Sequence, residues 1–93
     1  MKFAERYGPW AVIAGASEGT GRAFARQVAA QGVNCILIAR RDALLTALAA
    51  DIGAESDVEC VTAAIDLTAP DAFDRILAAT GEREVGLFIS NAG

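Results

Sequence analysis

The stretch AVIAGASEGTGRAF, Ala11 to Phe24, places three glycines, Gly15, Gly19 and Gly21, between an apolar run and an alanine-rich run. The apolar run is short and does not alternate, which is typical of a parallel strand buried on both faces. Glycines at a direct strand-to-helix turn let the backbone bend sharply and let an anion approach without a Cβ in the way. The free N–H groups and positive dipole end of the helix attract that anion. This turn therefore predicts a site for a pyrophosphate.

The rest of the chain continues the alternation of strand and helix. Strands are predicted at 10–15, 34–40, 57–66 and within EVGLFISNAG, and helices within 19–32, 42–53 and 68–81. Such alternation predicts an α/β fold with a parallel sheet and right-handed crossovers, as in slightly more than half of a doubly wound sheet. All 93 residues, 1–93, belong to this one domain.

Helix ends and apolar faces follow from local signals. Gly32 and Gly53 are predicted to stop the first two helices, and Thr68 is predicted to cap the third, with Pro70 near its first turn. The predicted core-facing residues are Leu44, Leu45, Leu48 and Ile52 in the second helix and Phe73, Ile76 and Leu77 in the third.

Composition excludes several classes of partner. The formal net charge is −4, which argues against a nucleic-acid or anionic-membrane surface. No apolar run approaches the roughly 18 residues of a membrane span, and the N-terminal residues lack the apolar stretch of a signal peptide. A cytoplasmic location is therefore expected.

The chain has two cysteines, Cys35 and Cys60, and no histidine. Both cysteines are expected to be small buried strand residues, because a disulfide is not expected in a cytoplasmic setting and two thiols alone make a poor zinc site. The lack of histidine excludes a Ser-His-Asp or Cys-His arrangement within these residues. We therefore expect no metal site here.

Three motifs, in the expected order and spacing, carry a resemblance to a known family. AGASEGTG (14–21) resembles the T-G-x-x-x-G-x-G loop of the short-chain dehydrogenase/reductase family. IDL (65–67) resembles the D-[VL] motif that follows the third strand in that family, and SNAG (90–93) resembles its N-N-A-G motif. The resemblance covers essentially the whole chain and implies a Rossmann-like sheet of strand order 3-2-1-4, truncated after the fourth strand. The chain looks most similar to the branch of 3-ketoacyl and 17β-hydroxysteroid reductases.

The resemblance implies a set of cofactor-binding residues. The glycines Gly15, Gly19 and Gly21 would form the turn, and Ser17, Glu18 and Thr20 would lie beside the phosphates. Asp66 and the Leu67 N–H would contact the adenine. The riboses would be bordered by Asn91, Ala92 and Gly93. The chain departs from the family pattern at Ala14, Thr20 and Ser90. The alternative interpretation is that the glycines serve only to pack the helix against the strand.

The end of the second strand bears on which dinucleotide binds. An NAD site there requires a carboxylate for the ribose 2′-OH, but that position is Ala39, and Arg40 and Arg41 follow it. The planar guanidinium matches a 2′-phosphate, so NADP(H) is predicted rather than NAD(H). The alternative is that both arginines are solvated charges, and Glu18 lies where many NADP-preferring members carry a basic residue.

The family's catalytic groups lie beyond the N-N-A-G motif, and this chain has no Tyr-x-x-x-Lys; its only tyrosine is Tyr7 and its only lysine Lys2. The sequence therefore predicts the NADP(H)-binding portion of an oxidoreductase of carbonyl or alcohol substrates, with no catalytic residue of its own and no activity alone. The alternatives are a non-catalytic nucleotide-binding module and a folded fragment that binds nothing.

The sequence also predicts self-association. The first two helices would cover one sheet face and the third alone the other, while AVIA, CILI and LFIS carry apolar side chains toward both. The fourth strand would be an unpaired edge. We therefore expect a homo-oligomer with Leu87, Phe88 and Ile89 at or near the contact.

Overall fold

Strands and helices alternate along the whole described chain, as the sequence predicts. The computed structural model describes residues 9–16, 19–40 and 42–90. Its elements are β1 (Trp10–Ala14), α2 (Gly19–Ala30), β2 (Asn34–Ala39), α3 (Asp42–Ser56), β3 (Cys60–Ala64), α4 (Ala72–Thr80) and β4 (Val85–Ser90). The strands form one parallel sheet in the order β3-β2-β1-β4, which confirms the predicted Rossmann-like fold.

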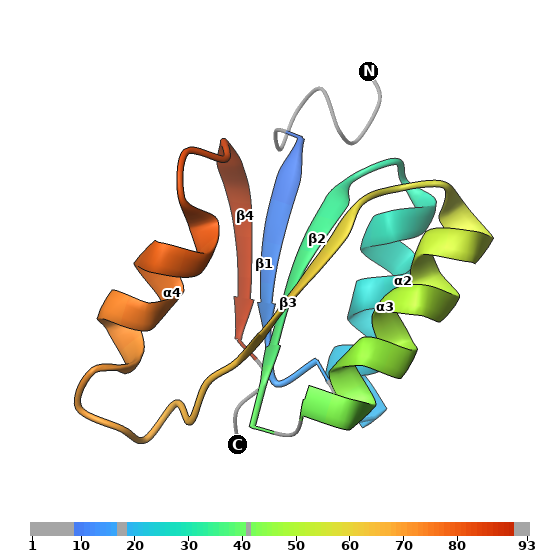
Figure 1. Cartoon of the computed structure of the whole chain (residues 1–93). Coiled ribbons are helices and arrows are strands. Elements are labelled where there is room, and N and C mark those ends of the chain that lie inside the picture. Colours follow the sequence, from blue (N-terminus) through green and yellow to red (C-terminus); the bar gives the residue numbers. More distant parts are fainter. Residues whose placement is uncertain (1–8, 17–18, 41, 91–93) are drawn as a thin grey trace.

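Helices lie on both faces of the sheet. Figure 1 shows α2 and α3 on one face and α4 on the other. One buried cluster joins α2 and α3 to Ile13 and Leu37, and the opposite cluster joins α4 to Val12 and Ile36. Alternate residues of β1 and β2 therefore enter different clusters, which explains why these strands read as continuous apolar runs.

The register of the central strand aligns the carboxyl ends of three strands. Ala14, the last residue of β1, is the partner of Ile38 in β2 and of Ser90 in β4. The turn after β1 and the residues after β2 therefore emerge at the same edge of the sheet, which is where ligands bind in open parallel sheets.

The predicted end of the first helix is confirmed, and that of the second is wrong. Gly32, just beyond α2, has a φ of 85°, whereas Gly53 lies inside α3, which continues to Ser56. Asp57 ends α3 instead: it has a φ of 53°, and its N–H donates to the Gly53 carbonyl at 3.0 Å. An interior glycine costs about 1 kcal/mol relative to alanine, too little to stop a packed helix. β3 consequently starts at Cys60 rather than at Asp57.

The predicted start of the third helix is also wrong. The Thr68 N–H and hydroxyl both donate to Asp66 Oδ1, at 2.9 and 2.7 Å, so the Thr68 side chain caps no helix. α4 starts four residues later, at Ala72, after Asp71, whose side chain makes no capping hydrogen bond. Pro70 therefore precedes the helix.

The apolar faces are partly as predicted. In α3, Leu45, Leu48 and Ile52 are buried, but Leu44 is 45% exposed. In α4 the face toward the sheet is Ala72, Ile76 and Ala79, while Phe73 and Leu77 are 69% and 52% exposed. The predicted α4 face is wrong at these two positions, because the helix is rotated by one residue, about 100°, from the assumed orientation.

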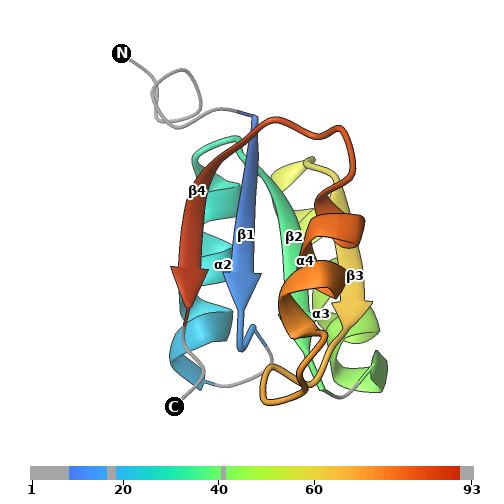
Figure 2. The same cartoon turned by 90° about the vertical axis from the view of Figure 1, so that its left-hand side faces the viewer.

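The sheet face that carries α4 is less open than predicted. Val12, Ile36 and Ile38 on that face are essentially fully buried, although the sequence predicts only one helix to cover the apolar side chains there. β4 departs from this, with Phe88 53% exposed. Figure 2 shows α4 in front of β2 and β3, to one side of β4. No helix in the described part of the chain is long and apolar enough to span a membrane.

Candidate functional site

The turn after β1 is fixed by the neighbouring strand. Gly15 has a φ of 76°, a left-handed conformation that favours glycine. The N–H groups of Gly15 and Ala16 both donate to the Ile38 carbonyl of β2, at 2.7 and 3.1 Å. The chain therefore leaves β1 at a defined angle and enters α2 at the carboxyl edge of the sheet.

The first turn of α2 lies directly against that bend. A Cβ built on Gly21 would lie 2.2 Å from the Gly15 oxygen and 2.9 Å from the Gly15 carbonyl carbon, both backbone atoms. No side chain fits there without moving the helix from the strand. Helix packing thus accounts for Gly21.

Gly19 differs from Gly21, although both belong to the same motif. It is exposed, and a Cβ built on it would meet nothing within 4 Å among the described residues. Its φ lies outside the left-handed region, so any residue could adopt its backbone conformation. Packing alone therefore does not account for Gly19, whereas close approach of a ligand to the helix N-terminus would.

Arg40 and Asp66 come together from neighbouring strands. The Ile65 N–H donates to the Ala39 carbonyl at 3.0 Å, so the residues after β2 and β3 lie side by side. The pKa of Asp66 is lowered, first by the hydrogen bonds from the Thr68 hydroxyl and N–H and then by the positive charge of Arg40. Both side chains are exposed, so this edge offers a carboxylate and a guanidinium to a ligand.

The remaining predicted residues have mixed outcomes. Leu67 is half-buried against the cluster beneath α4, and Thr20 lies in the first turn of α2. Six predicted residues lie outside the described residues: Ser17, Glu18, Arg41, Asn91, Ala92 and Gly93.

Sequence reasoning missed Thr68 as the partner of Asp66. An Asp followed two residues later by Thr is the signal that could have found it, since aspartate commonly accepts from the backbone two residues on.

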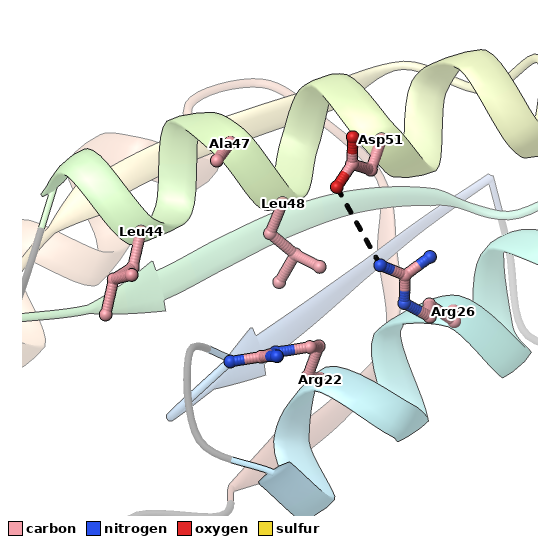
Figure 3. Close-up of a pocket in the computed structure, with 6 residues that line it drawn as sticks. All are labelled: Arg22, Arg26, Leu44, Ala47, Leu48 and Asp51. Carbon is pink, nitrogen blue, oxygen red and sulfur yellow. Dashed lines mark ion pairs between the residues drawn. The ribbon is translucent and has the colours of Figure 1, made fainter.

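A separate hollow lies between α2 and α3 (Figure 3). Its volume is about 140 Å³, and its lining residues are Arg22, Arg26, Leu44, Ala47, Leu48 and Asp51. Arg26 pairs with Asp51 at 3.9 Å and more closely with Glu55. Ligand pockets usually measure about 300–1,000 Å³. The hollow is therefore too small for a dinucleotide and contains none of the predicted site residues.

Curated relatives match nearly the whole chain. The 7beta-hydroxysteroid dehydrogenase of Mediterraneibacter gnavus is 35% identical over 86 residues, which are 92% of this chain and 33% of that protein. The very-long-chain 3-oxoacyl-CoA reductase of Laccaria bicolor is 37% identical over 94 residues, covering 99% of this chain and 28% of that protein. The chain thus spans about a third of the length of these relatives.

Solved structures agree with the sequence comparison. A structure from work on 7beta-hydroxysteroid dehydrogenase stereoselectivity matches with a TM-score of 0.92 and 36% identity, over 95% of this chain and 34% of that one. L-sorbose reductase from Gluconobacter frateurii, complexed with NADPH and L-sorbose, matches with a TM-score of 0.87 and 28% identity, over the same shares. The family model for short chain dehydrogenases matches residues 9–93. The chain therefore belongs to the short-chain dehydrogenase family.

Proposed function

We propose that this chain is the NADP(H)-binding portion of an oxidoreductase that acts on a carbonyl or alcohol substrate. The observation that carries the proposal is the open space beside Gly19, next to the tight Gly15–Gly21 contact at the carboxyl edge of the sheet. The positive end of α2 and the absence of a Cβ suit a pyrophosphate there. When bound, NADPH supplies a hydride, and the residues described here hold and orient its adenosine and phosphate groups.

The preference for the phosphorylated dinucleotide rests on the residues after β2. Ala39 is the last residue of β2 and offers no carboxylate to a ribose 2′-OH, while the Arg40 side chain is exposed immediately after it. A guanidinium forms paired, charge-assisted hydrogen bonds with phosphate oxygens. The NADPH held by L-sorbose reductase in a similar fold supports the same choice.

The test is a calorimetric titration of the 93-residue polypeptide with NADPH, combined with an assay of NADPH oxidation against ketones and 3-ketoacyl thioesters. We expect saturable binding without turnover, because the polypeptide contains no Tyr-x-x-x-Lys to move the proton. No heat of binding would contradict cofactor binding. Turnover above the uncatalysed rate would contradict the prediction that these 93 residues contain no catalytic group.

We also propose that two copies of the chain associate through the β4 side of the sheet. Phe73 and Leu77, one turn apart on α4, and Phe88 on β4 are exposed apolar side chains on the same side of the sheet. β4 pairs only with β1 in the described sheet, so its other edge can recruit a strand. A two-fold arrangement would cover both features.

Substitution of Phe88 tests this association. We expect the wild-type chain to elute as a dimer or larger species, measured by light scattering after size exclusion, and Phe88→Ser to shift it toward the monomer. Phe24→Ser is the matched control, because Phe24 is 40% exposed on α2, across the sheet. A monomeric wild-type chain at high concentration, or an equal effect of both substitutions, would contradict the proposed contact.

A further inference from the structure

Cys35 and Cys60, far apart in the sequence, are direct partners across two neighbouring strands. Each is near the start of its strand, and the β2–β3 register pairs their Cα atoms. Both belong to the sheet face that packs against α2 and α3. Neighbouring strands lie about 4.8 Å apart, within the roughly 4.4–6.8 Å between Cα atoms that a disulfide requires. The Cα separation expected for this register therefore lies in the range that a disulfide requires.

The two thiols differ in environment. Cys35 is fully buried, with its sulfur 3.6 Å from the Val33 carbonyl oxygen, whereas Cys60 is only half-buried. The neighbouring Cys35 thiol lowers the pKa of Cys60, whereas the Cys60 thiol and burial raise the pKa of Cys35. Cys60 is thus the more accessible thiol and the one with more thiolate character, and Cys35 lies beside it.

We propose that Cys35 and Cys60 are a redox-modification site that closes to an intrachain disulfide when the protein meets a hydroperoxide. The Cys60 thiolate attacks one oxygen of hydrogen peroxide, the O–O bond breaks, and Cys60 becomes a sulfenic acid as hydroxide leaves. The Cys35 sulfur then attacks the Cys60 sulfur, the S–O bond breaks, and the Cys35 proton leaves with that oxygen as water. Two thiols and one peroxide give one disulfide and two waters.

This site is separate from the proposed cofactor site. Cys35 and Cys60 lie near the amino ends of β2 and β3, whereas the glycine turn follows the carboxyl end of β1. The disulfide would join the outer strand β3 covalently to β2. The inference therefore stands or falls independently of cofactor binding.

The test is oxidation of the reduced chain with hydrogen peroxide at low protein concentration, followed by alkylation and intact-mass analysis. We expect a loss of about 2 Da, no alkylation of either cysteine and full reversal by dithiothreitol. A parallel reaction in 6 M guanidinium chloride is expected to be slower, because unfolding separates the two thiols and removes the Cys35 thiol that lowers the pKa of Cys60.

Two conservative variants assign the roles. Cys35→Ser is expected to leave Cys60 as a sulfenic acid that a dimedone probe captures, and Cys60→Ser to leave the buried Cys35 unoxidised. Retention of both thiols, formation of only a sulfinic acid or an intermolecular disulfide, or equal rates in native and denaturing conditions would overturn the proposal.

Discussion

Gly21→Ala is expected to give the largest loss of stability of any single methyl addition in the glycine turn. The new Cβ would lie 2.2 Å from the Gly15 oxygen, and that oxygen belongs to the backbone and not to a side chain that can rotate away. α2 must then move from β1, which breaks the packing of Ala25 and Val28 on the sheet. We expect a loss of about 3 kcal/mol or more in the free energy of unfolding. Urea unfolding followed by circular dichroism measures it.

Gly19→Ala is the matched control, since it adds the same methyl two residues away, where no atom of the described part of the chain lies within 4 Å. Its stability is expected to equal that of the wild type or to exceed it slightly, because alanine favours the helix. Its affinity for NADPH is expected to fall, since the methyl occupies the space proposed for the pyrophosphate. Unchanged NADPH affinity would argue against a cofactor at this turn, and a stable Gly21→Ala would argue against the described packing.

Arg40→Ala is expected to weaken NADPH binding about 10- to 150-fold and NADH binding much less. The range corresponds to the roughly 1.5–3 kcal/mol of a hydrogen bond to a charged group. Only NADPH has the 2′-phosphate that Arg40, exposed after β2, is proposed to hold. Isothermal titration with both nucleotides at one fixed salt concentration measures the two losses.

Arg75→Ala controls for the change in net charge. Arg75 is an exposed arginine on α4 that pairs with Asp71 at 3.3 Å within its own helix segment. Its removal makes the net charge, −4 in the wild type, more negative by the same one unit as Arg40→Ala but is expected to leave both nucleotide affinities unchanged. Equal losses of NADPH and NADH in Arg40→Ala would show that Arg40 is an ordinary surface charge.

The element order could be predicted from the sequence pattern, and the strand order from the resemblance to the family. Buried strands are unbroken apolar runs, and the glycine turn identifies the first strand-to-helix junction. The sequence therefore predicts strands at 10–15 and 34–40, and the structure confirms them one residue shorter, as β1 and β2. For the candidate site, strand direction alone predicts that one edge of the sheet carries Gly15, Gly21, Arg40 and Asp66. Parallel strands bring their carboxyl ends together wherever their exact bounds fall.

The errors concern choices that depend on tertiary contacts. Gly53 stays helical because α3 packs on the sheet through Ile52, which offsets the weak helix propensity of one glycine. The Thr68 hydroxyl donates to Asp66 rather than capping a helix. Because a threonine hydroxyl can do either, the sequence alone does not indicate which partner it has. Their apolar side chains predict a core position for Phe73 and Leu77, but the rotation of α4 directs the smaller Ala72 and Ala79 there.

The strand order has a consequence for how the sheet assembles. Pairing β1 with β2 brings together residues about 24 apart, Trp10 and Asn34, whereas pairing β1 with β4 joins Trp10 to Val85, about 75 residues away. Because the entropy of loop closure grows with the logarithm of loop length, the second pairing costs about 1 kcal/mol more when made from the open chain. The unit from β1 to β3 closes through short loops, so its formation costs the least loop-closure entropy. We therefore expect it to form first and then to serve as the template for β4. During synthesis, the central strand therefore keeps one edge unpaired until nearly all of these residues have left the ribosome.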